Sequence, residues 1–182
     1  FEGPVGAYKA AGSGPWDDVL AGYVGSTDIE EPYSNAQSAA TQAYPCYEGY
    51  YNEYGTNECL IVTDGWFATS GGVLIVGCVY TAATQEVACP DGSYNADGSG
   101  PCDDVPAGYF GSTDIAEPYS HAPSAATQAY PCYEGYYNEN GTNECLIVTD
   151  GWFASNGCEL IEDYVSTAAI QKVACPYGSY NA

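Results

Sequence analysis

A tandem repeat of 43 residues constrains this chain more than any other feature. The segment Gly3–Ala88 recurs as Cys89–Ala174, and 32 of 43 positions are identical in each half of that comparison. A weaker similarity relates the halves to each other, since Cys46-Tyr-Glu-Gly-Tyr-Tyr-Asn aligns with Cys89-Pro-Asp-Gly-Ser-Tyr-Asn. Such a chain is expected to form one small structural unit several times, with each unit contacting mainly its neighbours.

The repeats are numbered from this recurring start. Repeat 1 is residues 3–45, repeat 2 is 46–88, repeat 3 is 89–131, repeat 4 is 132–174, and residues 175–182 begin a fifth. A higher-order duplication relates 3–88 to 89–174. The alternative to four stacked units is a globular 86-residue domain built from two repeats. Because no export signal is visible, we expect the chain to be a mature product or a piece of a longer one.

Six of the nine cysteines follow the pattern C-x2-G-x-Y-x3-G-x3-C, which repeats 2, 3 and 4 each contain. Repeat 1 has Gly3 and Trp16 at the two cysteine positions, and the loss of both together is what a bond between them predicts. The predicted disulfides are Cys46–Cys59, Cys89–Cys102 and Cys132–Cys145. Closing a loop of this size stabilises a fold by roughly 3 kcal/mol. A high cysteine count also indicates an oxidising compartment.

Three cysteines stay outside this scheme: Cys78, Cys158 and Cys175. Cys175 occupies the first cysteine position of a repeat, so its partner is expected beyond Ala182 or on a neighbouring subunit. Zinc is excluded as the reason for the cysteines, because there is no C-x2-C pair and His121 is the only histidine.

One stretch of the chain resembles the ephrin-receptor-like cysteine-rich repeat of extracellular fibre and surface proteins. The resemblance is carried by Cys89-Pro-Asp-Gly-Ser-Tyr, Cys102 and Pro106-Ala-Gly-Tyr-Phe, which match its C-P-x-G-x-Y and P-A-G-Y segments. It covers about half of each repeat, and Ser112–Gln128 departs from its compact form. The resemblance implies a structural or adhesive module with no catalytic residues.

The local sequence favours short strands. Glu48–Tyr51, Leu60–Thr63 and Leu146–Thr149 are aromatic and β-branched runs bounded by Gly, Asn and Asp. Ser38–Gln42 and Ser124–Gln128 are expected to form a helical turn at most. We therefore predict an all-β, irregular fold of small disulfide-stapled tandem repeats, stacked end to end as a rod or solenoid. Tyrosines at the sixth position of each repeat are expected to form a ladder: Tyr8, Tyr51, Tyr94, Tyr137 and Tyr180.

The charge balance excludes several classes of partner. The chain has 24 acidic residues and only two basic ones, Lys9 and Lys172. The resulting net charge of −22 repels nucleic acid. No apolar run approaches the roughly 20 residues that span a bilayer, so no membrane insertion is expected. The chain has no Gly-x-Ser-x-Gly or P-loop motif, and the position equivalent to His121 is Asn35. We predict that it is not an enzyme.

Two features are candidates for ligands or modification. Weak calcium candidates are Asp103, Asp104, Asp114 and Glu117, with Asp17, Asp18, Asp28 and Glu31 at the equivalent positions. Diffuse screening by counter-ions is the favoured alternative, and no other cofactor is expected. Asn140-Gly-Thr is an N-glycosylation sequon.

Together these features predict a secreted or cell-surface structural protein: a tyrosine-rich, acidic glycoprotein that assembles with itself into an extracellular filament, fibril or surface layer. The alternative is a carbohydrate-binding adhesin or receptor-stalk module. Its candidate residues are Trp66, Phe67, Trp152 and Phe153, because aromatic faces stack on sugars. The favoured interpretation of Trp66 and Trp152 is that they form the cores of their repeats.

Overall fold

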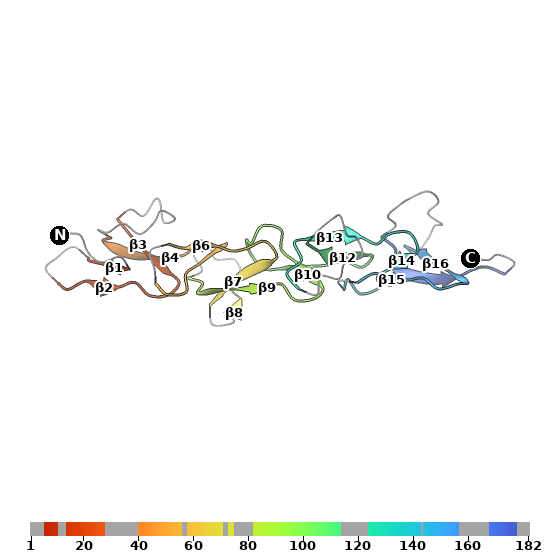
Figure 1. Cartoon of the computed structure of the whole chain (residues 1–182), viewed down its shortest axis with the longest axis horizontal. Coiled ribbons are helices and arrows are strands. Elements are labelled where there is room, and N and C mark those ends of the chain that lie inside the picture. Colours follow the sequence, from red (N-terminus) through yellow and green to blue (C-terminus); the bar gives the residue numbers. More distant parts are fainter. Residues whose placement is uncertain are drawn as a thin grey trace. The chain divides into compact units, whose positions relative to one another are not determined.

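The computed structural model describes residues 6–10, 14–27, 40–55, 58–70, 73–74, 82–113, 124–142, 144–156 and 168–177. Over this part of the chain the fold is all-β, with short strands and no helix (Figure 1). The chain forms two compact units. The first comprises Phe1–Val87 with Asp97–Pro101, and the second comprises Ala88–Ala96 with Cys102–Ala182.

Each repeat begins with a two-stranded antiparallel ribbon whose strands start ten residues apart. These ribbons are β1 (Ala7–Tyr8) with β2 (Asp17–Asp18), β5 (Tyr50–Tyr51) with β6 (Leu60–Ile61), β10 (Ser93–Tyr94) with β11 (Asp103–Asp104), and β14 (Tyr136–Tyr137) with β15 (Leu146–Ile147). The strands recur at intervals of 43 residues although their sequences differ. The ribbon of repeat 2 pairs Tyr-Tyr with Leu-Ile, whereas the ribbon of repeat 3 pairs Ser-Tyr with Asp-Asp.

A second, longer ribbon completes each repeat. These ribbons are β3 (Tyr23–Ser26) with β4 (Gln42–Pro45), β12 (Tyr109–Ser112) with β13 (Gln128–Pro131), and β16 (Trp152–Ser155) with β17 (Gln171–Ala174). Repeat 2 has three strands here, in the order β8 (Val73–Leu74), β7 (Trp66–Ser70), β9 (Gln85–Ala88). Pro45 and Pro131 are the last residues of their strands, where the missing N–H does not interrupt the pairing.

The sequence predictions match this structure in part. The predicted runs contain the observed strands β5, β6 and β15, but each run is longer than its strand. At Ser124–Gln128, where a helical turn at most is expected, the structure has no helix: Ala126 forms a parallel bridge with Tyr94 and Gln128 begins β13. Ser38 and Ala39 of the sister tract lie outside the described residues.

The buried core of the described residues is small, and in the first unit it is built around a disulfide. In the first unit Val24, Cys46 and Cys59 form a buried cluster, against which Tyr44 and Tyr50 pack. In the second unit Phe110 is the largest fully buried side chain, and its ring centroid lies 6.1 Å from that of Tyr130. Because a repeat of this length buries little apolar surface, covalent links and polar contacts carry more of the stability.

Candidate functional site

The three disulfides predicted from the cysteine pattern are present, each closing a loop with a sequence separation of 13. The Cα atoms are 5.8 Å apart in all three, inside the range of ordinary disulfides. Cys46, Cys89 and Cys132 are fully buried. In repeat 1, where Trp16 replaces the second cysteine, the Lys9 Nζ lies 6.0 Å from the centroid of the Trp16 ring. A cation–π contact thus stands near the position of the missing disulfide.

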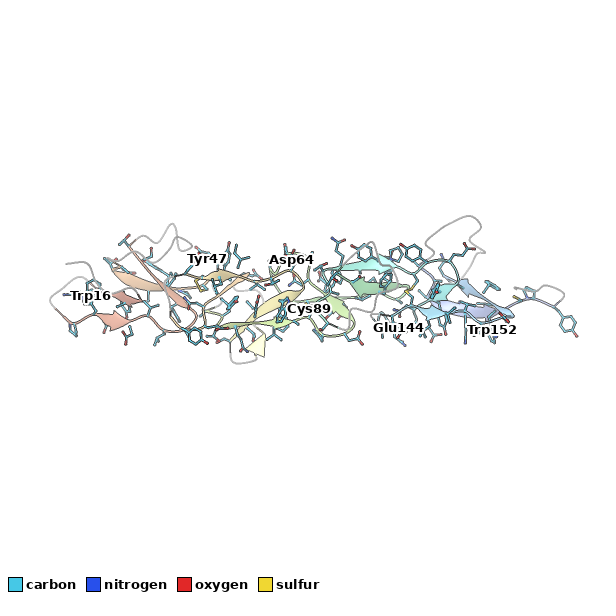
Figure 2. All side chains as sticks on the ribbon, in the orientation of Figure 1. Trp16, Tyr47, Asp64, Cys89, Glu144 and Trp152 are labelled. Carbon is cyan, nitrogen blue, oxygen red and sulfur yellow. A yellow bond between two sulfur atoms is a disulfide. The ribbon has the colours of Figure 1, made fainter. Side chains whose placement is uncertain are left out.

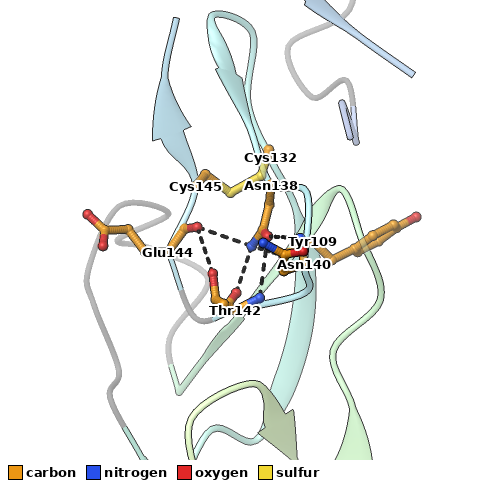
Figure 3. Close-up of a disulfide and its surroundings, with 7 residues drawn as sticks. All are labelled: Tyr109, Cys132, Asn138, Asn140, Thr142, Glu144 and Cys145. Atoms are coloured by element: carbon orange, nitrogen blue, oxygen red, sulfur yellow. Dashed lines mark hydrogen bonds between the residues drawn. A yellow bond between two sulfur atoms is a disulfide. The ribbon is translucent and has the colours of Figure 1, made fainter. Parts of the chain in front are cut away.

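Each repeat that contains a disulfide also has a buried asparagine at its seventh position. Asn52, Asn95 and Asn138 are only 1%, 3% and 2% exposed. Figure 3 shows Asn138 next to the Cys132–Cys145 bond, surrounded by backbone groups. A buried side-chain amide has two N–H donors and one oxygen acceptor, and all of them need hydrogen-bond partners. For Asn138 and Asn52, main-chain groups supply these partners.

The Asn138 side chain joins repeat 4 to repeat 3. Its Nδ2 group donates to the carbonyl of Tyr109 in the preceding repeat at 2.7 Å, and to the carbonyls of Thr142 at 2.7 Å and Glu144 at 3.1 Å. Its Oδ1 accepts from the amides of Asn140 at 3.1 Å and Thr142 at 3.3 Å (Figure 3). One side chain therefore orders its own loop and binds the first residue of β12 in the previous repeat.

Asn52 makes the equivalent contacts in the first unit. Its Nδ2 group donates to the carbonyls of Tyr23 at 2.9 Å and Glu58 at 3.1 Å, and its Oδ1 accepts from the Tyr54 amide at 3.2 Å. The Asn52–Tyr23 and Asn138–Tyr109 bonds both span 29 residues. The link between repeats is thus the same in both compact units.

Main-chain hydrogen bonds reinforce these links. The Gly22 amide donates to the Asn52 carbonyl at 2.7 Å, and the Gly108 amide donates to the Asn138 carbonyl at 2.8 Å. The Asn138 amide in turn donates to the Ala169 carbonyl at 2.9 Å. Because these bonds join main-chain groups only, a change of side chain leaves them intact as long as the two backbone segments can still approach each other.

Glycines permit that close approach. A Cβ at Gly55 would overlap the carbonyl of Val19, and a Cβ at Gly141 would overlap the carbonyl of Val105. Both glycines have φ of +63°, in the left-handed region that other residues rarely adopt. Glycine is required at this tenth position for both steric and conformational reasons.

A second close approach involves a strained alanine. A Cβ at Gly22 would overlap the Ala82 carbonyl, and one at Gly108 would overlap the Ala168 carbonyl. Ala82 and Ala168 have φ of +47° and +45°, which costs an L-residue roughly 1 kcal/mol each. We call the whole set of contacts the repeat junction. It comprises Val19, Gly22 and Tyr23 against Asn52, Gly55 and Ala82, and Val105, Gly108 and Tyr109 against Asn138, Gly141 and Ala168.

Sequence reasoning did not single out the junction residues, although a signal was present. Asparagine occupies the seventh position of repeats 2, 3 and 4, each of which follows another repeat, whereas repeat 1 has Lys9 there. Glycine stands at the tenth position of all four repeats. Reading the repeat for positions that differ only in its first copy would have found the asparagine.

The predicted calcium and glycan residues are not among the residues that define the repeat junction. Asp103 and Asp104 are exposed neighbours on β11, and adjacent strand residues point to opposite faces. Asp114 and Glu117 lie outside the described residues. Within the part of the chain that the structure describes, no group of three or more His, Cys, Asp or Glu residues is placed to hold a metal ion. Asn140 is exposed on the junction loop, where its side chain is accessible to modification.

The aromatic residues correct one sequence interpretation. Trp152 is not a core residue: it is 38% exposed and lies at the surface of its ribbon (Figure 2). Trp66, Phe67 and Phe153 are half-buried. In the equivalent ribbon of repeat 3 the next residue along the strand, Phe110, is buried, because successive side chains point to opposite faces.

Lys172, one of the two lysines, lies near aromatic rings of repeat 4. Its Nζ is 5.4 Å from the centroid of the Trp152 ring and 5.8 Å from that of Tyr137. Tyr8, Tyr51 and Tyr94 lie on the equivalent strands of the other repeats, and Tyr180 falls outside the described residues.

Cys175 is a free, half-buried cysteine held at the start of the fifth repeat. Its amide donates to the Gly151 carbonyl at 2.9 Å, as the amides of Cys46 and Cys132 do to Gly22 and Gly108. Cys78, Cys158 and His121 lie outside the described residues.

Within the described residues, no helix has the length and apolar character needed to cross a membrane. Comparison of the sequence with protein-family models finds no match. Comparison with curated proteins also finds no match.

Proposed function

We propose that this chain is a structural subunit of an extracellular filament or surface layer. In this proposal its repeats stack end to end, and copies associate through contacts of the same kind. The observation that carries it is the repeat junction, formed by equivalent residues in both compact units. A chain in which the buried amides of Asn52 and Asn138 and closely packed glycines join one repeat to the next is suited to forming an elongated assembly.

The covalent and electrostatic features support an extracellular location. Three disulfides are typical of proteins that fold in oxidising compartments. The net charge of −22 keeps subunits soluble until salt or divalent ions screen their repulsion. The exposed Asn140 is a site where a eukaryotic secretory pathway would add a glycan.

The test is whether the purified, oxidised chain polymerises. Sedimentation velocity and negative-stain electron microscopy over a range of protein and NaCl concentrations are expected to show assemblies that lengthen as salt rises, because screening weakens the repulsion between acidic copies. The control is the reduced and alkylated chain, which loses the disulfides and is expected not to assemble. A chain that stays monomeric at every concentration and salt level contradicts the proposal.

Carbohydrate binding by an adhesin or receptor stalk is the second candidate, and the exposure of Trp152 favours it. An indole at the surface offers a face for a sugar ring, although Lys172 already lies near that face. A glycan array probed with the native chain and with Trp152→Ala tests it. Binding that disappears in the variant, with thermal stability unchanged, would move this function ahead of the structural one.

A further inference from the structure

Repeats 2 and 4 carry opposite charges at one position of an otherwise similar structure. The forty-first position is Glu86 in repeat 2 and Lys172 in repeat 4, whereas repeats 1 and 3 have Ala43 and Ala129 there. The Glu86 side chain is half-buried and Lys172 is exposed. Because Lys172 is one of only two basic residues in a chain of net charge −22, this exchange of glutamate for lysine sets the two repeats apart electrostatically.

In repeat 2 the Glu86 carboxylate is held in place by side chains of the same repeat. One of its oxygens accepts from the Thr63 amide at 2.9 Å, and the other accepts from the Thr63 hydroxyl at 3.4 Å. The Tyr51 hydroxyl also forms a hydrogen bond with Glu86. Burial, together with the Glu86 and Glu53 carboxylates, raises the pKa of Tyr51. The carboxylate is therefore fixed beside Tyr51.

In repeat 4 the Lys172 ammonium group takes the equivalent place. Its Nζ lies 5.8 Å from the centroid of the Tyr137 ring, the counterpart of Tyr51, and 5.4 Å from that of Trp152. A cation near the face of an aromatic ring is attracted by the quadrupole of the ring and keeps its charge. Each of the two repeats thus presents one positioned charge beside the same tyrosine.

An exposed leucine lies next to each of these tyrosines. Leu60 is the cross-strand partner of Tyr51, and Leu146 is that of Tyr137, so each leucine shares a face of its ribbon with the tyrosine. Both leucines are 48% exposed. We call the surface of Leu60, Tyr51 and Glu86 the Glu86 face, and that of Leu146, Tyr137 and Lys172 the Lys172 face.

We propose that the Glu86 face of one copy of this chain binds the Lys172 face of a second copy. This inference rests on the proposed function and adds a second contact between copies to it. In the contact, the two charges form an ion pair and the two leucines pack against each other. Because the contact joins two different surfaces, it can propagate from copy to copy.

Charge complementarity selects this occupant over other pairings of repeats. Two Glu86 faces bring like charges together, and so do two Lys172 faces, which disfavours both pairings. Repeats 1 and 3 offer neither group, since they have alanine at the forty-first position and Asp17 and Asp103 in place of the leucines. In a chain with 24 acidic residues, a lysine gives the Lys172 face an attraction for a second acidic copy.

Charge reversal at the two positions tests the pairing. Glu86→Lys makes both faces basic and Lys172→Glu makes both acidic, so each variant alone is expected to associate roughly 3- to 10-fold more weakly than the native chain. Glu86→Lys also makes the chain less acidic, so overall repulsion alone predicts stronger association for it. Association is measured by sedimentation velocity at the lowest NaCl concentration at which the native chain assembles.

The decisive sample is an equal mixture of the two single variants. In this mixture every basic face can meet an acidic face of the other variant, so association is expected to return to the native level. The double variant Glu86→Lys with Lys172→Glu, in which the charges have changed places, is also expected to associate like the native chain. A role for either residue within its own repeat predicts no such rescue.

The folding cost of these variants is expected to be small. Each new side chain enters surroundings that already hold it in the other repeat, since Thr149 and Tyr137 are the counterparts of Thr63 and Tyr51. Melting temperatures of both single variants are therefore expected to match the native value within a few degrees. The matched control is Asp103→Lys, the same reversal of charge at an exposed residue of repeat 3, which is expected not to weaken association.

Each outcome decides a separate point. If both single variants assemble as well as the native chain, the pairing of the two faces is wrong but the filament function stands. If both are weakened and their mixture is not restored, the two residues act within their own repeats and the pairing is again wrong. A native chain that never assembles refutes the filament function and this inference together.

Discussion

Asn138→Ala is the sharpest test of what holds successive repeats together. The side chain is 2% exposed and takes part in five hydrogen bonds, of which the bond to the Tyr109 carbonyl crosses between repeats. Alanine removes all five and leaves a small void beside the Cys132–Cys145 bond. The groups that lose a partner are main-chain carbonyls and amides.

The size of the expected stability loss depends on how many of those main-chain groups can form hydrogen bonds with water instead. The Thr142 and Glu144 segment is exposed, so its carbonyls rehydrate at little cost. The Tyr109 carbonyl lies at the junction, where an unsatisfied group costs about 1–3 kcal/mol. With the net value of the remaining bonds, we expect a loss of about 2–4 kcal/mol in the free energy of unfolding of the second unit.

The assay combines urea unfolding of the oxidised protein, followed by tyrosine fluorescence, with hydrogen exchange of the Gly108 amide. That amide donates to the Asn138 carbonyl, so its protection reports on the junction itself. The matched control is Asn140→Ala, two residues along the same loop with an exposed side chain, which is expected to stay within about 0.5 kcal/mol of the native protein.

Asn138→Asp adds a test with a pH signature. It keeps the acceptor oxygens but replaces the donor with a carboxylate that faces three carbonyls. This variant is expected to be less stable than Asn138→Ala at neutral pH and to recover as acidification protonates the carboxyl, which then donates. If Asn138→Ala costs less than about 0.5 kcal/mol and Gly108 exchange is unchanged, the buried amide does not hold the junction.

Three further predictions address the disulfides, the exposed strands and one acidic loop. Replacing Cys132 and Cys145 together by serine is expected to cost about 3 kcal/mol in urea unfolding, since a loop of this size is no longer closed. Leu146→Asp is expected to leave the melting temperature within about 2 °C of the native value, because Leu146 is 48% exposed and the equivalent residues of repeats 1 and 3 are aspartates; a large loss would show that the strand is covered. Hydrogen bonds from the Ser99 hydroxyl and amide hold the pKa of Asp97 below its ordinary value. The stability from this turn is therefore present at neutral pH and lost as pH falls through that lowered pKa. Hydrogen exchange of the Ser99 amide is expected to become faster in acid, relative to its intrinsic rate, as this stability is lost. An exchange rate that follows only the intrinsic pH dependence would count against this prediction.

The sequence was sufficient for the features that depend on local spacing. Paired absence of cysteines in repeat 1 predicted all three disulfides, because a bond requires both partners. Aromatic and β-branched runs beside glycines predicted the positions of strands such as β6 and β15. Strand lengths were overestimated, because strand pairing ends where the neighbouring strand turns away. The local preference of a sequence for β-structure does not indicate where that happens.

The tertiary structure alone decided which side chains face another repeat. In the sequence alone, Asn138 resembles an ordinary loop residue. In the structure, its side-chain Nδ2 group lies 2.7 Å from the carbonyl of Tyr109, which is 29 residues earlier in the chain. Ala168 has left-handed backbone although alanine does not favour it, and Gly108 must lack a side chain because the Ala168 carbonyl lies against it. Trp152, expected in a core, is 38% exposed. Spacing along the chain fixes what lies within a repeat, but contacts between repeats depend on how closely two distant backbones approach, and that distance is set only when the whole fold has formed.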